Sequence, residues 1–590
     1  MDLTRRTLAA TLPAAAALAI ASRAAASPAA EHFHHIWTDE WAWREAQFPD
    51  DEDPDRPLTT FLPQAGPAAE AARLARWREV QAALGRVDRA ALSPEDQVNF
   101  DIYRGQIEAL EAAQAFGEWQ APFNSDSSFW GNLAETGHRP LRTEAQARAY
   151  LARLSQTRRY FGQQIEAMRL GLARGFTPPR VTLAGRDLSV AAVAEAASPQ
   201  ATVFFTPLAS LPASISPAVA ADLRAQAASV ISAEVIPAHR ELLTFLRTEY
   251  LPRTRTTLAA EALPDGRAYY RSKIIEFTTL DLTPQEIHAL GLSEMAMIHA
   301  RMAEVMAEVK FAGDLPAFLK FLRADPRFYV TTPQALLDRA AWTAKTFDGK
   351  AEQWFGRLPR RRFAIRPVPD AIAPFYTAGR GGPGVYLLNT YDLPSRPLYA
   401  LTALTLHESA PGHAFQMPIA SEQTGLPVFR RKGYISAFGE GWALYCERLG
   451  IEMGMYPTPY DLFGMWSYQA WRAARLVVDT GVHAMGWSRE QAIDYVAQNT
   501  ALSAHEIETE VDRYISWPGQ SLSYYLGERA ILQARAKAEA ALGPRFDIRH
   551  FHDTVLQLGS VPLPVLTARI DRFIAEGGPS PYPSDDKANG

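Results

Sequence analysis

Two histidines and a glutamate stand close together in TALTLHESAPGHAFQ, residues 402–416: His407, Glu408 and His413. Imidazole nitrogens beside a carboxylate are the groups with which zinc peptidases hold the metal and activate a water molecule. The common motif, H-E-x-x-H, places its histidines four residues apart on one helix, whereas here they are six apart. Because an α-helix turns about 100° per residue, that spacing points the second ring away from the first. One metal ion can bind both histidines only if the helix is interrupted between them.

The residues between the histidines supply such an interruption. Pro411 and Gly412 directly precede His413. Proline removes a helix hydrogen bond and clashes with the preceding turn, and glycine accepts unusual backbone angles. Two residues looped out here would return His413 to the helix face that a histidine four residues after His407 occupies. We therefore predict a site for one Zn²⁺ ion, with His407 and His413 as ligands. The alternative is a helix end with two structural histidines.

A catalytic zinc site needs a third protein ligand and keeps one position open for water. SAFGEGWALYCERLG, residues 436–450, offers Glu440 and Glu447, which share a helix face because they are seven residues apart. Glu440, between two glycines, is the predicted ligand, and Glu447 is predicted to orient a histidine from behind. The sequence leaves open which of the two binds the metal, and a salt bridge with Arg448 or another cation is the alternative for Glu447. Glu408 is placed to act as the general base.

Apolar residues recur at three- and four-residue steps over much of the chain, as in helices that bury one face. The clearest segments are 143–175 and 283–309, each opened by a threonine with Gln or Glu three residues later. Strand signals are sparse, and the best is Val385–Asn389, which follows a glycine-rich turn. We predict a mainly α fold.

Domain boundaries are weakly marked. We expect a single large helical metallopeptidase-like domain over residues 31–575, with the zinc site at 380–530, and a flexible tail over 576–590. The chain has 590 residues, is 47% hydrophobic and has a formal net charge of −5, so it can bury a large core. No lysine- or arginine-rich block supports nucleic-acid binding. The lone cysteine, Cys446, excludes an internal disulfide.

The first thirty residues have the order of an export signal. Arg5 and Arg6 precede an uncharged, alanine-rich stretch from Thr7 to Ser22, and small residues follow. That stretch is too short for a stable membrane span. The paired arginines resemble a twin-arginine signal, so we predict a signal peptide over 1–30 and a periplasmic or otherwise exported protein. The alternative is an ordinary secretory signal with a chance arginine pair.

The motif HESAPGHAFQ together with FGEGWALYCE resembles the bacterial family catalogued as domain of unknown function 885. The resemblance covers almost all of the chain after the signal and includes residues 284–292, 382–390 and 512–527. The family looks like a distant branch of the gluzincin zinc peptidases. The resemblance implies His407, His413 and Glu440 as zinc ligands and Glu408 as general base. A second histidine that often follows the PGH of the family is replaced here by Ala414.

The resemblance also implies a fold and a substrate site. The implied fold is a large, two-lobed helical gluzincin-like structure, with a deep cleft and a small strand element beside the active-site helix. Gluzincins commonly bind the peptide backbone along a strand edge above the zinc ion, and Tyr386 to Asn389 match that strand. Tyr524 matches a tyrosine that stabilises the oxyanion, with Tyr525 as runner-up. Arg513 either grips a substrate carboxylate or pairs with a local acid such as Glu510.

These observations predict an exported zinc-dependent hydrolase, in the first place a metallopeptidase that cleaves short peptides. The alternatives are a zinc amidase or esterase with a non-peptide substrate, and a non-catalytic binding protein stabilised by zinc. A second His-Glu pair, His505 and Glu506, lacks a following histidine and is not counted as a metal motif. The sequence does not indicate whether cleavage is internal or terminal, or the oligomeric state.

Overall fold

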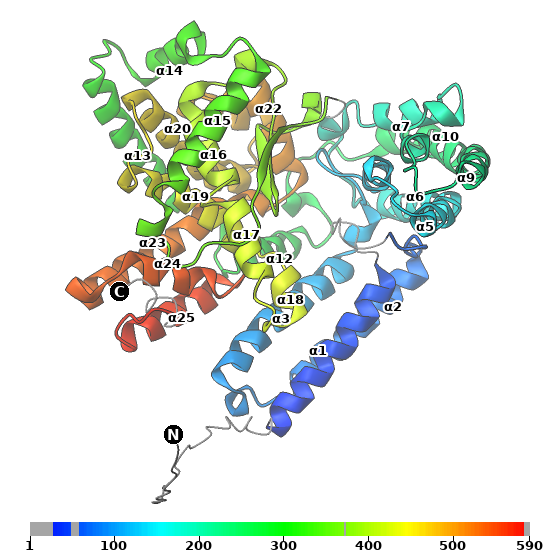
Figure 1. Cartoon of the computed structure of the whole chain (residues 1–590), viewed down its shortest axis with the longest axis horizontal. Coiled ribbons are helices and arrows are strands. Elements are labelled where there is room, and N and C mark those ends of the chain that lie inside the picture. The colour runs from blue at the N-terminus through cyan, green and yellow to red at the C-terminus, as the bar shows by residue number, and fades with distance from the viewer. Residues whose placement is uncertain (1–26, 49–57, 371–372, 583–590) are drawn as a thin grey trace, which may run out of the picture.

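The protein is built almost entirely of helices (Figure 1). The computed structural model describes residues 27–48, 58–370 and 373–582. The predicted signal peptide therefore lies outside the described residues up to position 26. Residues 28–30 belong to the first helix, which Ser27 caps. None of the helices in the described ranges is long and apolar enough to cross a membrane.

Three long helices begin the described chain and lie diagonally below the rest in Figure 1: α1 (Pro28–Gln47), α2 (Pro67–Leu84) and α3 (Pro94–Phe116). A lobe of shorter helices follows on the right: α4 (Phe129–Glu135), α5 (Glu144–Leu154), α6 (Thr157–Arg174), α7 (Leu188–Ala194), α8 (Thr206–Ala209), α9 (Pro217–Val230), α10 (Ile236–Phe245) and α11 (Leu251–Arg253).

The remaining helices form the main body. Its first half contains α12 (Gly266–Thr278), α13 (Pro284–Glu308), α14 (Leu315–Ala324), α15 (Pro333–Asp348), α16 (Leu398–Glu408), α17 (His413–Ser421) and α18 (Val428–Lys432). Its second half contains α19 (Ser436–Glu452), α20 (Pro459–Ala484), α21 (Arg489–Asn499), α22 (Ala504–Ser516), α23 (Ser523–Leu542), α24 (Ile548–Leu556) and α25 (Leu563–Ala575).

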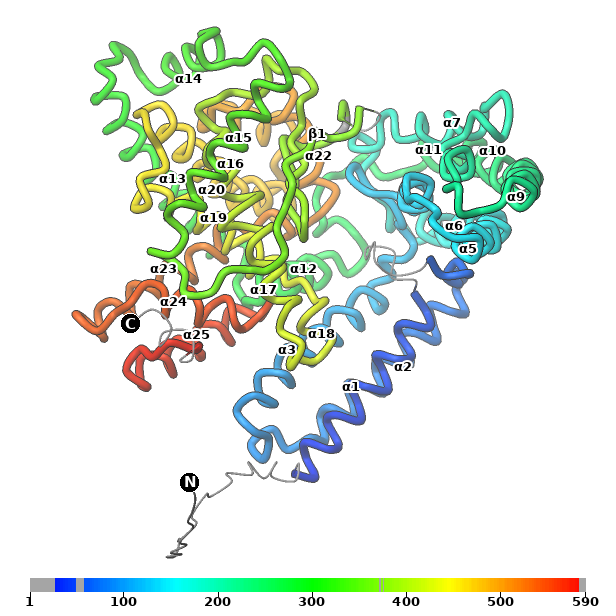
Figure 2. Tube along the Cα trace, in the orientation of Figure 1, coloured from blue at the N-terminus to red at the C-terminus, as the bar shows by residue number. Residues whose placement is uncertain are grey.

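Buried apolar side chains form three clusters. One fills the side lobe and draws only on residues 58–251. The second lies between α13, α16, α20 and α22. The third joins the N-terminal helices to α19 and to the last helices of the chain. The N-terminal helices therefore belong to the main body, and Figure 2 shows α3 running beside α18, where the Gln106 amide donates to the Phe429 carbonyl at 3.2 Å.

The two long helices predicted from the sequence have different outcomes. The segment opening at Thr283 forms α13, with the predicted capping box in place. The segment 143–175 is two helices, α5 and α6, because the chain breaks at Ser155 and Gln156. The Ser155 hydroxyl donates to Ala152 O within the same segment, and the Gln156 amide donates to Thr60 O of a distant segment.

A single three-stranded sheet is found in the described part of the chain: β1 (Ala364–Pro367), β2 (Gly379–Gly382) and β3 (Val385–Leu388), in the order β1-β3-β2. The predicted strand is β3, and it pairs parallel to β1 and antiparallel to β2. Both edges of β3 are therefore occupied, and matching Tyr386–Asn389 to a free strand edge was wrong. The strand that contacts α16 and α17 is β2.

Two glycines let α19 and α23 cross at close range. A Cβ atom on Gly441 would lie 2.4 Å from the carbonyl carbon of Gly527. A Cβ atom on Gly527 would lie 1.9 Å from the Ala437 carbonyl oxygen. Neither position can hold a larger residue unless the helices separate, because such distances are far below van der Waals contact. Glu440 precedes the first glycine, and Tyr524 lies one turn before the second.

Candidate metal centre

The helix that carries His407 is interrupted where the sequence predicts it. α16 ends at Glu408 and α17 begins at His413, with residues 409–412 between them. The Gly412 amide donates to Leu406 O at 3.0 Å, so the chain folds back onto the helix end. A Cβ atom on Gly412 would lie 1.8 Å from the His407 carbonyl oxygen, which excludes any other residue from this path. The indole of Trp442, on α19, donates to Pro411 O at 2.8 Å and holds the break in place.

The interruption brings the two histidines together. Their ring centroids are 4.9 Å apart, and both side chains are buried. The Nε2 atoms of His407 and His413 lie 3.4 Å and 3.3 Å from the same atom, Glu440 Oε2. Ligands about 2.1 Å from a tetrahedral zinc ion lie about 3.4 Å from one another. The distances from Glu440 Oε2 to the two imidazole nitrogens therefore fit one zinc ion.

Glu408 lies beside these donors. One of its carboxylate oxygens belongs to a group with one nitrogen of His407 and one of His413, all within 4.8 Å of one another. Its Oε2 accepts from the Gly381 amide at 2.6 Å, which ties the carboxylate to strand β2. A Cβ atom on Gly381 would lie 1.8 Å from the Glu408 carbonyl oxygen, so glycine is needed for this approach. The predicted base is thus held next to the metal position.

Glu447 lies on the other side of His407. Its Oε1 is 2.7 Å from His407 Nδ1, and Arg472 Nη2 is 3.2 Å from the same oxygen. Glu447 is fully buried. A carboxylate only accepts, so Nδ1 carries a proton and Nε2 points towards Glu440. The structure places Glu440 beside Nε2 of His407 and Glu447 beside Nδ1. Glu447 also makes an ion pair, the alternative that the sequence left open, and its cation is Arg472.

The histidines and carboxylates of the centre shift one another's pKa values. Burial alone would lower the pKa of His407, but its contacts with Glu440 and Glu447 outweigh this effect and raise the pKa to about 9. Burial raises the pKa of Glu440, and His413 and His407 lower it well below its usual value. The same carboxylates would stabilise a divalent cation in place of the imidazole protons.

Tyr524 lies over the face of the His407 ring and contacts two arginines. Its ring stacks on the imidazole at a centroid distance of 6.3 Å and an angle of 18°. The Arg475 guanidinium lies 4.2 Å from the centre of the tyrosine ring. Arg513 Nη2 donates to the Tyr524 hydroxyl at 3.3 Å. Tyr525 points elsewhere, and its hydroxyl donates to Glu294 at 2.9 Å on α13. Of the two candidates, only Tyr524 is beside the centre.

Arg513 has protein partners. It donates to Gln520 at 2.6 Å and to Glu510 at 3.2 Å, in addition to Tyr524. Of the two roles that the sequence left open, these contacts match the structural one.

Tyr386 and Asn389 are fully buried. The Asn389 amide donates to the carbonyls of Ala373, Tyr376 and Thr377, at 2.9, 2.9 and 3.2 Å. Asn389 therefore fixes the loop that leads into β2. With no exposed surface, neither side chain reaches a substrate in this conformation.

The sequence reasoning missed two residues near the centre. Tyr434 has its ring 6.5 Å from that of His413, and it approaches Gly439, where a Cβ atom would lie 2.6 Å from the tyrosine hydroxyl oxygen. Arg380 is exposed on β2, between Gly379 and Gly381, and this strand contacts Glu408. Glycines around both residues are the only sequence signal that could have indicated a close approach.

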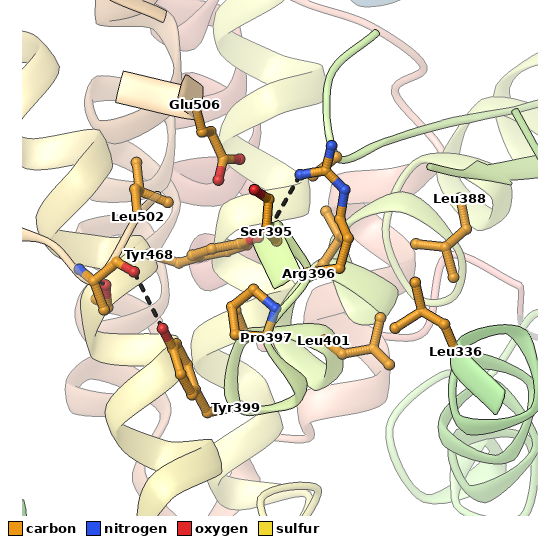
Figure 3. Close-up of a pocket in the computed structure, with 15 residues that line it drawn as sticks. Leu336, Leu388, Ser395, Arg396, Pro397, Tyr399, Leu401, Tyr468, Leu502 and Glu506 are labelled. Atoms are coloured by element: carbon orange, nitrogen blue, oxygen red, sulfur yellow. Dashed lines mark hydrogen bonds between the residues drawn. The ribbon is translucent and has the colours of Figure 1, made fainter. Parts of the chain in front are cut away.

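An apolar pocket lies beside the N-terminal half of α16 (Figure 3). Leu401 and Leu404 line it from the same helix face as Glu408, and Leu388 lines it from β3. Arg396 and Glu506 form its polar side in Figure 3. Burial raises the pKa of Glu506 to about 7, although Arg396 lowers it. Glu506, which belongs to the His-Glu pair that was not counted as a metal motif, therefore lines this pocket.

Comparisons with known proteins place the chain in a bacterial protein family. A family model described as "Bacterial protein of unknown function (DUF885)" matches residues 54–570. The chain resembles a crystal structure of a "putative lipoprotein" from Colwellia psychrerythraea, with 25% identity, a TM-score of 0.82, and coverage of 93% of this chain and 98% of that one. A "putative lipoprotein of unknown function" from Shewanella oneidensis has the same fold, with 17% identity, a TM-score of 0.66, and coverage of 92% and 99%. No curated protein matches.

Proposed function

The chain belongs to the bacterial family DUF885, and for this member we propose the function of a zinc-dependent hydrolase, in the first place a metallopeptidase for short peptides. One observation carries the proposal. The Nε2 atoms of His407 and His413 both lie within 3.4 Å of Glu440 Oε2, and Glu408 lies beside them without being needed as a ligand. Two imidazoles and one carboxylate leave a position for water, which is the donor set of catalytic zinc.

His407, His413 and Glu440 would hold the ion. A zinc ion there supplies a lowered pKa for water and polarises a substrate carbonyl. Glu408, tied to the Gly381 amide, accepts the proton of the attacking water and passes it to the leaving nitrogen.

Tyr524 would stabilise the oxyanion. Because Arg513 donates to the phenol oxygen, the phenol proton is free to point away from Arg513, towards the developing negative charge. A link to the gluzincins and a substrate cleft between two lobes are parts of the same proposal. They are supported by the ligand types and by the separate core of the side lobe.

Export is also proposed. The arginine pair before an uncharged stretch predicts it, and both similar solved structures carry a lipoprotein description. The expected compartment is the periplasm. The first helix begins at Pro28, so a cleavage site before Ser27 preserves the helix cap, whereas cleavage after Ala30 removes the first turn.

The test measures metal and turnover together. Purified protein lacking residues 1–26 is assayed for zinc by elemental mass spectrometry, beside His413→Ala and Glu408→Gln. We expect about one zinc ion per chain in the parent and in Glu408→Gln, and a loss of zinc in His413→Ala. A panel of short peptides, amides and esters then identifies the substrate class.

The outcomes separate the alternatives. Turnover of peptides that Glu408→Gln abolishes supports the peptidase. Turnover of only non-peptide amides or esters supports the amidase or esterase. Absence of zinc from the parent, or full zinc retention in His413→Ala, overturns the metal centre. Zinc without turnover of any substrate leaves the non-catalytic binding protein.

A further inference from the structure

Arg380 differs from the other arginines close to the centre. Arg472 pairs with Glu447, and Arg475 and Arg513 both pair with Glu510. Arg380 makes neither an ion pair nor a side-chain hydrogen bond with any residue in the described ranges, and it is exposed. It is therefore the arginine near the centre whose guanidinium is available to a ligand.

The position of Arg380 relates it to the reacting groups. The backbone amide of the next residue, Gly381, donates to the Glu408 carboxylate. This hydrogen bond fixes the backbone of Arg380 close to the predicted base. The acidic residues whose charges act on its guanidinium include Asp126 and Glu408.

The guanidinium is also oriented. It lies 5.6 Å from the centre of the Tyr376 ring, within the range of a cation–π contact. The Asn389 amide holds the carbonyls of Tyr376 and Thr377, so the loop carrying this ring is fixed from the buried side. An exposed arginine that merely increases solubility needs no such support. This one is presented on a rigid strand beside the base.

From these contacts we infer that Arg380 binds the C-terminal carboxylate of the substrate peptide. The inference rests on the proposed peptidase function and adds its direction: the enzyme cleaves near the carboxyl end. A guanidinium presents a planar fork of N–H donors that matches a carboxylate bidentately, and the pair is stronger than a neutral hydrogen bond. A cation fixed beside Glu408 places that carboxylate close to the scissile bond and excludes long C-terminal extensions from tight binding.

The experiment compares peptides that differ only in a C-terminal acid or amide. The variants are Arg380→Gln and a matched control, Arg366→Gln, which alters an exposed arginine on β1 at the other edge of the same sheet. We expect the parent to prefer the acid. Arg380→Gln should lower kcat/KM for the acid about tenfold to a hundredfold, chiefly through KM, and leave the amide unchanged. Arg366→Gln should match the parent with both peptides.

A binding measurement makes the test independent of turnover. Calorimetry with Glu408→Gln should show tighter binding of the acid than of the amide, and adding Arg380→Gln should remove the difference. Equal use of acid and amide by an active parent, or an equal loss on both in Arg380→Gln, overturns the role of Arg380 and leaves the peptidase standing. Failure of the parent to cleave any peptide overturns the peptidase, and equal binding of acid and amide overturns the anchor.

Discussion

Replacing Glu447 by glutamine tests whether the group behind His407 tunes the metal centre. The change removes a charge and keeps the size of the side chain. It weakens the 2.7 Å contact to His407 Nδ1 and leaves Arg472 without its anionic partner. Arg472 is buried, so it cannot exchange the lost partner for water.

Two magnitudes follow from these contacts. Losing the partner of a ligating histidine lowers metal affinity about tenfold to a hundredfold, or roughly 1.4–2.7 kcal/mol. Removing one partner of a buried ion pair costs about 3–5 kcal/mol of folding free energy. The cost is smaller here if the amide oxygen of the glutamine still accepts a hydrogen bond from Arg472. We therefore expect weaker zinc binding together with a lower unfolding free energy of the metal-free protein.

The assay is zinc affinity by chelator competition, with urea unfolding of the metal-free protein. Glu528→Gln is the matched control, because Glu528 is also fully buried and binds the Gln469 amide at 2.9 Å. Burial raises its pKa to about 8, so it is largely neutral at pH 7 and glutamine should replace it at little cost. Equal zinc affinity in the parent and in Glu447→Gln would refute the reasoning, as would an equal loss in both variants.

Three further substitutions test other parts of the structure. Tyr524→Phe should lower kcat about tenfold to a thousandfold with KM and zinc content unchanged, and unchanged kcat in steady-state assays contradicts the oxyanion role. Gly412→Ala should lose zinc and about 1–3 kcal/mol of stability, because its Cβ would meet the His407 carbonyl at 1.8 Å, and normal zinc content contradicts this. Burial raises the pKa of Asp479 to about 7, well above the usual value for an aspartate, so the folded state binds the proton more tightly and stability should fall as pH rises between about 4 and 7. Asp479→Asn should flatten that fall in urea unfolding, and an unchanged slope refutes the assignment.

The cluster of His407, His413 and Glu440 was predictable because its sequence signals are local. Proline and glycine before His413 dictate a helix break wherever they occur in a helix, and the spacing of Glu440 and Glu447 fixes their common face. The sequence could not show which carboxylate faces which nitrogen of His407. That depends on how α19 packs against α16, a contact between distant segments.

The positions of β3 and of the two tyrosines on α23 were less predictable, because they too depend on contacts between distant segments. β3 reads as a strand from its own residues, but its central position depends on pairing with β1 and β2. Two adjacent tyrosines are equivalent in a one-dimensional pattern, and the helix rotation of α23 separates Tyr524 from Tyr525. The split of 143–175 arises because Gln156 contacts Thr60, almost a hundred residues earlier.

The close crossing of α19 and α23 restricts how the sequence of this protein can diversify. Glu440 and Tyr524 lie on two helices whose backbones are in contact at Gly441 and Gly527. Glycine is the smallest residue, so no substitution at these positions could bring the helices closer. Any larger residue moves both helices at once and changes the distance between the metal position and the tyrosine. Substitutions that change substrate preference are therefore expected in β2 and the side lobe and not in these two helices. Relatives with different preferences are expected to keep both glycines and to vary at Arg380.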